Sequence, residues 1–156
     1  MAKSAIEKIL EDKTIKITEL PDTLNKWGPP SASMVISTPK EVDAIMATVP
    51  KGKLITTTEI RARLSTKHKT DITCPLTTGI FMNISAKATE EKRELGTPES
   101  EVTPYWRCLK AGGELNPKYP GGIDHQASQL EAEGFSIRRK GKRAFVEAFE
   151  KSLVAV

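Results

Sequence analysis

The sequence predicts a mainly α-helical fold with a small amount of β structure. Three segments in the middle of the chain carry apolar residues at helical spacing, and each begins with residues typical of a helix start. Near the C-terminus, two short apolar segments flank a basic turn that contains glycine, a pattern typical of a β-hairpin. Hydrophobic residues make up 38% of the 156-residue chain and charged residues 28%, which favours one folded domain with a modest extension.

The first segment of the chain predicts a small α/β extension. Apolar residues fall on one side of a short helix over residues 3–12, and residues 14–20 alternate as a strand does. Prolines and a glycine then punctuate a loop that holds Trp27. We expect residues 1–36 to pack on the main domain, residues 37–156, because they are too few to hold a core of their own.

The main domain opens with two helices. A hydroxyl residue followed by Pro39 is a good start signal for the first, and Pro50 and Gly52 end it. The second helix begins at Thr56. The spacing from Thr56 to Glu59 fits a capping box, in which each residue bonds the backbone of the other.

A third helix is expected over residues 75–92, where apolar residues recur every four positions. Gly79 is expected to permit close helix contact. A polar link over residues 65–71 joins this helix to the second. Two helices joined by a short basic link suggest a helix-turn-helix, with 75–92 as the recognition helix.

The C-terminal part predicts a wing. Residues 105–110 are expected to be extended, and a helix over 123–133 should stop at Gly134. Residues 135–146 form the basic hairpin, and a last short helix is expected over 147–153. The whole is therefore a winged helix-turn-helix domain with a β-hairpin wing and a short N-terminal α/β extension.

Positive charge is segregated along the chain. The net charge of +4 is modest, but basic residues gather in residues 51–69 and 138–143, while acids concentrate in 90–101. Such segregation favours a phosphate-binding face, and the alternative is that these side chains only solubilise the surface. The expected phosphate contacts are Lys51, Lys53, Lys67, Lys69, Arg138, Arg139, Lys140, Lys142 and Arg143.

Several functional classes find no support in the sequence. The two cysteines have no spacing with histidines that would indicate zinc, nor a disulfide framework. There is no glycine-rich phosphate loop, so we expect no cofactor and no metal. No apolar run reaches the roughly 18 residues that a membrane span needs. We expect a cytoplasmic, nucleoid-associated monomer.

Four segments occur in the order found in alkylguanine-DNA alkyltransferases and alkyltransferase-like proteins. The match covers about residues 37–135. The segments are Val49-Pro50-Lys51-Gly52-Lys53 with Thr56-Thr57-Thr58-Glu59-Ile60, the helix around Gly79, Pro104-Tyr105-Trp106-Arg107, and the glycine pairs 112–113 and 121–122 followed by Leu130-Glu131-Ala132-Glu133-Gly134. The chain therefore resembles this family in its winged-helix DNA-binding domain.

This resemblance implies a domain that enters the minor groove of DNA and flips an alkylated guanine into a pocket. In the alkyltransferases, a cysteine thiolate activated by histidine takes the alkyl group. Here Tyr105 stands at the cysteine position and Trp106 at the histidine position. A phenol, with a pKa near 10, is a far poorer nucleophile, so we expect no enzyme activity. Alkyltransferase-like proteins also carry an aromatic residue there and mark lesions for excision repair, which makes double-stranded DNA and excision-repair proteins the expected partners.

The resemblance also assigns base-pocket residues. Thr57 aligns with the tyrosine that rotates the target phosphate, and Leu76 with the intercalating arginine. Since neighbouring strand residues point to opposite faces, we expect Tyr105 to face the pocket and Trp106 the core. The hypothesis of lesion recognition requires Tyr105 to lie in a concavity. The complete expected set is Thr57, Leu76, Thr77, Thr78, Tyr105, Trp106 and Arg107.

Two other functions stay open. The first is a true alkyltransferase that uses Cys108 or Cys74; Cys74 precedes a helix start, where thiol pKa values fall, whereas Cys108 fits a small buried hydrophobe better. The second is a winged-helix regulator or interaction module without a lesion pocket, because fold does not fix function. For Glu133, a structural role is favoured over a role in the pocket.

Overall fold

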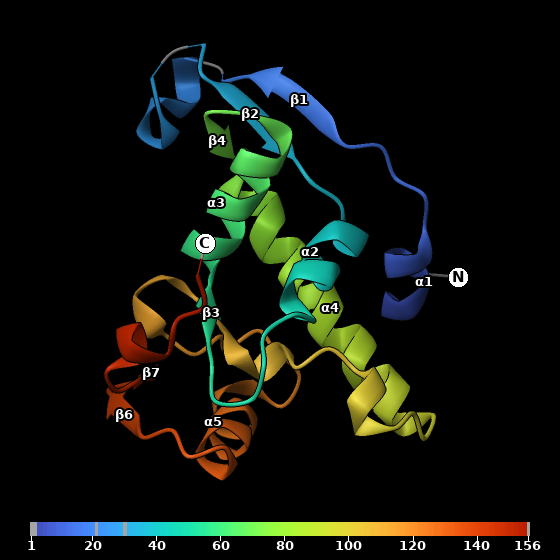
Figure 1. The fold of residues 1–156 in the computed structure, drawn as a ribbon, viewed down its shortest axis with the longest axis vertical. Helices are drawn as coiled ribbons and strands as arrows, with labels where there is room; N and C mark the ends of the chain where they lie inside the picture. The colour runs from blue at the N-terminus through green and yellow to red at the C-terminus, as the bar shows by residue number, and fades with distance from the viewer. Residues whose placement is uncertain (1–2, 21, 30, 156) are drawn as a thin grey trace.

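The computed structural model describes residues 3–20, 22–29 and 31–155. Three helices form its centre: α2 (Pro39–Met46), α3 (Thr57–His68) and α4 (Pro75–Glu94). Figure 1 shows α4 running obliquely through the molecule, and both α2 and α3 pack against it. The predicted mainly α fold is confirmed. Pro21 and Pro30, two of the expected loop signals, lie outside the described residues.

Local sequence explains where these helices begin. Thr38 caps α2 by accepting a hydrogen bond from the backbone N–H of Glu41 (3.2 Å), and Pro39 follows in the first turn. Thr56 and Glu59 form the predicted capping box of α3. That helix ends at Lys69, whose backbone takes a left-handed conformation (φ 56°). Residues 70–74 follow and include the two-residue strand β4 (Ile72–Thr73), and α4 then begins at Pro75.

The N-terminal part packs on the helices through two elements. Helix α1 (Ala5–Leu10) lies against α4, and the Glu91 carboxylate accepts hydrogen bonds from the backbone N–H groups of Ala5 and Ile6 (3.0 Å each). A small sheet has the order β1 (Lys16–Glu19), β2 (Ser33–Ile36) and β4 (Ile72–Thr73). Strand β2 is antiparallel to β1 and parallel to β4, so the extension shares a sheet with the helix-turn-helix link.

Two further strand pairs position the C-terminal half. Strand β3 (Ile55–Thr56) is parallel to β5 (Cys108–Leu109). The wing is an antiparallel hairpin of β6 (Ile137–Lys140) and β7 (Arg143–Val146), as predicted. Helix α5 (Gly122–Ala132) precedes it in the lower part of Figure 1 and ends before Gly134, which takes a positive φ of 96°.

Two predictions of secondary structure are wrong. Residues 105–110 are not one extended segment, since Tyr105–Arg107 form a 3-10 turn before β5 begins. Pro104 has no N–H to give to a sheet, and its carbonyl instead accepts from the backbone N–H of Arg107 (3.1 Å). The expected helix over 147–153 is a short 3-10 turn, Phe149–Ser152.

The main core lies between the helices and the C-terminal half. Its largest fully buried side chains include Met46, Leu64, Met82, Tyr105 and Leu130, which come from four helices and the 3-10 turn. Within the described ranges, no helix is long and apolar enough to cross a bilayer.

We predict that Thr56→Ala lowers the free energy of unfolding by about 1–2 kcal/mol, because it removes the side-chain acceptor of a buried N-cap. In a chain of this size, this corresponds to a fall in Tm of about 2–8 °C. Thermal unfolding followed by circular dichroism measures it. Thr66→Ala, on an exposed position of the same helix, is the control and should leave the Tm nearly unchanged. Equal effects of the two variants would contradict the capping role.

Candidate nucleic-acid interface

A groove of about 370 Å³ lies between the N-terminal half of α4 and the loop over residues 110–118, and we call it the α4 groove. Leu76 and Ile80 of α4 line it with 64% and 48% of their surface exposed, although large apolar side chains usually pack inside. Its lining residues are Thr57, Arg61, Pro75, Leu76, Gly79, Ile80, Met82, Asn83, Lys110, Ala111, Asn116, Pro117 and Lys118.

Gly79 keeps this groove open. A Cβ atom at that position would meet nothing within 4 Å, so the glycine makes no close helix contact. Our expectation for Gly79 is therefore wrong. The missing side chain instead leaves space between the two exposed apolar residues, Leu76 and Ile80, on the same helix.

The charge of the α4 groove is entirely positive among its described lining residues. Arg61, Lys110 and Lys118 contribute three cations, and the lining contains no aspartate or glutamate. The nearest carboxylate to Lys110 is that of Glu114, at 3.9 Å, and it accepts shorter bonds from Arg143 (2.9 and 3.0 Å). A concave surface with one sign of charge concentrates counter-ions of the opposite sign. This groove is therefore suited to an anionic ligand.

Buried amides hold the loop that rims the groove. The Gln126 side chain, which is fully buried, accepts from the backbone N–H of Asn116 (2.8 Å) and donates to the Trp106 carbonyl (3.1 Å). The Asn116 amide donates to Asn83 of α4 (3.1 Å), so both walls of the groove are joined. The same Asn116 side chain accepts from the backbone N–H of Lys118 (2.9 Å).

The wing lies next to this loop. The backbone N–H of Leu115 donates to the Ala144 carbonyl of β7 (2.9 Å). Part of the basic hairpin cluster is neutralised, because Arg143 pairs with Glu114 and Arg139 pairs with Asp124 (2.9 Å each). The predicted phosphate contacts Arg138, Lys140 and Lys142 are exposed.

A second, larger cavity of about 610 Å³ lies around Trp106, and we call it the Trp106 cavity. Its arginines are paired: Arg107 Nη2 lies 2.7 Å from Glu133, and Arg93 Nη2 lies 2.7 Å from Glu99. Both guanidinium groups also lie over the Trp106 ring, that of Arg93 at 4.7 Å and that of Arg107 at 5.5 Å from its centroid. Because both of its arginines are paired with carboxylates, this cavity is a weaker candidate for binding a polyanion.

Tyr105 is fully buried and lines neither the α4 groove nor the Trp106 cavity. Its hydroxyl donates to Glu90 (2.6 Å), and burial together with this carboxylate raises the pKa of the phenol well above its usual value. The expectation that Tyr105 faces a pocket is wrong, whereas Trp106 belongs to the core as expected and also lines the Trp106 cavity. The alternation of a strand does not apply within a 3-10 turn, where the two rings meet edge to face.

The Glu133 carboxylate holds the 3-10 turn Tyr105–Arg107 through hydrogen bonds to two of its side chains. It accepts from Trp106 Nε1 (3.0 Å) and from Arg107, whose other nitrogen donates to the Val49 carbonyl (2.8 Å). Burial alone would raise the pKa of the Glu133 carboxyl, but the hydrogen bonds from Arg107 and Trp106 outweigh it and hold that pKa below its usual value. The structural role expected for Glu133 agrees with these contacts.

The other residues expected to line the base pocket do not all face the same surface. Thr57 and Leu76 line the α4 groove, and Thr77 is half-buried beside it. Thr78 is buried, and its hydroxyl donates to the Cys74 carbonyl (2.8 Å), so the expectation that it faces a ligand is wrong. A helix turn places Thr78 on the inner side of α4, whereas Leu76 lies on the outer side.

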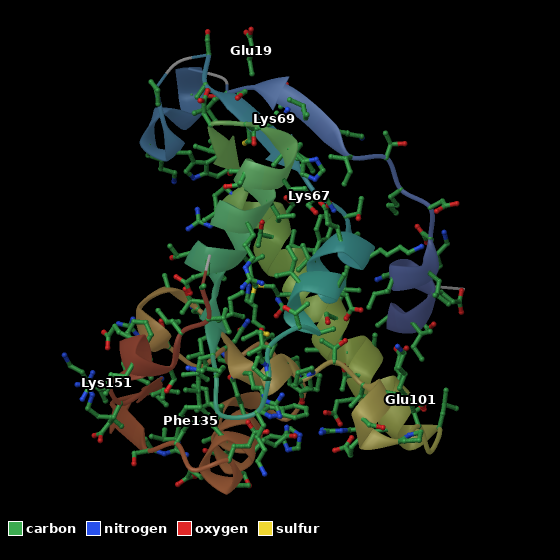
Figure 2. All side chains as sticks on the ribbon, viewed as in Figure 1. Glu19, Lys67, Lys69, Glu101, Phe135 and Lys151 are labelled. Atoms are coloured by element: carbon green, nitrogen blue, oxygen red, sulfur yellow. The ribbon has the colours of Figure 1, made fainter. Side chains whose placement is uncertain are left out.

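Lys67 and Lys69 lie away from the C-terminal turn that follows the wing. Figure 2 shows Lys67 and Lys69 in the upper part of the molecule and Lys151, just beyond the wing, at the lower left. Lys67 pairs with Glu41 (2.8 Å), whereas Lys69 is exposed. Of the other expected phosphate contacts, Lys53 is exposed and Lys51 lines the Trp106 cavity. Their contacts with phosphate remain predictions.

Both cysteines are buried. Cys108 has no exposed surface, and burial raises the pKa of its thiol well above the usual value. Cys74, at the start of α4, is 5% exposed. A buried, protonated thiol is a poor nucleophile, so Cys108 does not fit the role of an alkyl acceptor.

Sequence reasoning missed three groove cations. Arg61 belongs to the basic region 51–69 but is not among the phosphate contacts expected from the sequence. Lys110 and Lys118 flank glycine and proline turns. Basic residues in loops that follow the segment Pro104–Arg107 are a signal of a binding surface, and this signal could have identified them.

We predict that Glu133→Gln lowers the free energy of unfolding at neutral pH by about 2 kcal/mol, because charged hydrogen bonds to Arg107 and Trp106 are lost. A carboxyl whose pKa is lower in the folded state stabilises the fold above its unfolded pKa, about 4.3, and this contribution disappears as the pH falls through the folded value. The difference between the variant and the natural chain should therefore shrink below about pH 4. Urea unfolding at several pH values measures it.

The matched control is Glu131→Gln, which removes an exposed carboxylate from the same helix. It should change stability by less than about 0.5 kcal/mol. If the two variants are equally stable at neutral pH, Glu133 does not hold the turn.

Comparison with known proteins supports the fold. No protein-family model matches the chain, and no curated protein matches it in sequence. A similar solved structure is that of S. pombe Atl1 in complex with damaged DNA containing O6-carboxymethylguanine, which is 18% identical, with a TM-score of 0.50. The match covers 76% of this chain and 94% of Atl1. The chain thus has the fold of an alkyltransferase-like protein, a mainly α winged helix with a β-hairpin.

Proposed function

We propose that this chain binds double-stranded DNA through the α4 groove and recognises a modified base there without transferring the alkyl group. The observation that carries the proposal is a concave surface with three cations, no lining carboxylate and two exposed apolar side chains on the recognition helix. The fold is shared with Atl1, whose solved structure contains damaged DNA.

The groove holds cationic side chains, which suit the phosphates of DNA, and apolar side chains, which suit the bases. Lys110 and Lys118 lie on the loop that rims the groove, where they can contact phosphates and release counter-ions. Leu76 and Ile80 project from α4 between these cations and Thr57. Exposed apolar side chains that enter the minor groove act as wedges, because they open a base step and bend the duplex.

The same geometry argues against alkyl transfer. A nucleophile must reach the alkyl carbon of the bound base. The Tyr105 oxygen is buried against Glu90, and the Cys108 thiol is buried in the core. Among the described residues that line the α4 groove there is no cysteine. Binding without covalent chemistry is the function that these contacts support.

Because Tyr105 lines neither the α4 groove nor the Trp106 cavity, the hypothesis that places the lesion against Tyr105 is wrong, and a flipped base needs another receiving site. The α4 groove, at about 370 Å³, falls within the range of roughly 300–1,000 Å³ that is usual for small-ligand pockets. Asn83 and Asn116 supply amide groups to its wall, and Pro117 and Ile80 supply apolar surface. Contacts of these kinds offset the few kcal/mol that unstacking costs. A DNA complex marked in this way would then recruit excision-repair proteins.

A second candidate function is a winged-helix interaction module without a lesion site. The burial of Tyr105 favours it, because the aromatic residue at the position of the reactive cysteine serves the core and not a pocket. The exposed Leu76 and Ile80 would then contact a protein. Binding to DNA at low salt separates the two candidates.

We predict that replacing Lys110 and Lys118 together by serine weakens binding to every duplex and reduces the slope of log affinity against log salt by about 2, since two phosphate contacts are lost. Fluorescence anisotropy with a labelled duplex measures it. The control replaces Lys16 and Lys26, two exposed lysines of the N-terminal part, by serine and removes the same charge. Equal losses in both double variants would mean that net charge alone drives binding.

We also predict that Leu76→Ser reduces affinity for a duplex with O6-alkylguanine more than for the unmodified duplex, by about three- to tenfold, because an apolar wedge is lost. Leu95→Ser, at the exposed far end of α4, is the control. Equal affinity of the natural chain for both duplexes would remove modified-base recognition and leave general DNA binding. No binding at low salt would support the interaction module.

A further inference from the structure

Arg61 differs from the other groove cations because it comes from a helix in the body of the protein. It lies in the second turn of α3, and its backbone carbonyl accepts a hydrogen bond from Thr73 Oγ1 (2.9 Å). Its side chain is half-buried and lines the α4 groove beside Thr57. The backbone contact ties this turn of α3 to β4, next to the start of α4.

The guanidinium of Arg61 has a donor without an acceptor. Within the described part of the chain, Arg61 Nε is the one buried side-chain nitrogen or oxygen that has no hydrogen-bond partner. Other partly buried arginines are satisfied: Arg93 and Arg107 by carboxylates, and Arg63 by the Ala155 carbonyl. A buried donor left unpaired is unfavourable, and more so when it is charged. Because Arg61 lines the α4 groove, an anion that enters the groove is the candidate partner for its guanidinium.

We infer that Arg61 is the anion receptor of the α4 groove and binds a DNA phosphate oxygen with its guanidinium. The inference rests on the proposed function and adds a residue that fixes the position of the backbone. Lys110 and Lys118 are exposed and flexible point charges at the rim. Arg61 supplies a planar fork of donors deeper inside, and this geometry suits phosphate oxygens.

A DNA strand fits this site better than a single carboxylate of a protein partner. The groove is lined by three cations, and a strand brings several phosphodiesters of one charge each at a regular spacing, whereas one carboxylate brings a single charge. The neighbouring Leu76 and Ile80 offer apolar surface. DNA presents both features at a fixed spacing, with phosphates next to a base or sugar face. A phosphate bound to Arg61 would therefore hold the strand while the nucleotide beside it contacts α4.

The experiment compares Arg61→Gln with Arg63→Gln, which removes the same charge from the same helix outside the α4 groove. Anisotropy with O6-alkylguanine and unmodified duplexes, at low and at physiological salt, gives affinity and salt slope. We expect Arg61→Gln to weaken binding about tenfold or more and to reduce the salt slope by about 1. Arg61→Lys should restore the slope but not the full affinity, because the fork is lost.

Thermal unfolding of the same variants tests a structural role. Because Arg61→Gln removes an unpaired buried charge, its Tm should equal or exceed that of the natural chain. A lowered Tm, or failure to fold, would mean that Arg61 is structural and would overturn the inference. Binding by Arg61→Gln that equals that of Arg63→Gln would also overturn it while leaving the proposed function intact. Absence of binding by the natural chain to either duplex would overturn the proposed function as well.

Discussion

The buried amide of Gln126 joins the two segments on which the α4 groove depends. Through its oxygen it holds the backbone of Asn116, and through its nitrogen it holds the carbonyl of Trp106. The loop at 110–118 and the 3-10 turn therefore share one anchor on α5. An amide without exposed surface must satisfy both its donor and its acceptor, so neither segment can move freely without leaving a buried polar group unpaired. This fixes one wall of the groove, while α4 supplies the other.

The burial of Tyr105 decides against a base site at the position that the family resemblance aligns with a reactive cysteine. A phenol that donates to Glu90 and meets the rings of Trp106 and Tyr119 edge to face is part of the core. Tyr105, which the family resemblance aligns with the reactive cysteine, lines neither the α4 groove nor the Trp106 cavity, whereas its neighbour Trp106 lines the latter. A site for a base would therefore have to be formed by residues other than Tyr105. In this chain, the concave surface on the recognition helix is the α4 groove.

Local signals in the sequence predicted the helices well and the site only in part. The cap at Thr56, Pro39 at a first turn and Gly134 after α5 are local, so their elements could be placed from the sequence. The turn at Tyr105–Arg107 could not, because it depends on Glu90 and Glu133, distant carboxylates that accept from two neighbouring rings. Of the groove, Leu76 and Thr57 were found by resemblance. Arg61 of α3 lines the same groove as Lys110 and Lys118 of the 110–118 loop only when these two separate segments fold against α4.

Pairing of charges decides which concave surface can bind an anion. The Trp106 cavity is larger, yet Arg93 and Arg107 already have carboxylate partners, and a phosphate would have to displace them. In the α4 groove, three cations have no carboxylate beside them in the lining, and Arg61 Nε is without a hydrogen-bond partner. An anion bound there would offset the cost of gathering these positive charges on one concave surface. The α4 groove is therefore better suited to an anionic ligand than the Trp106 cavity.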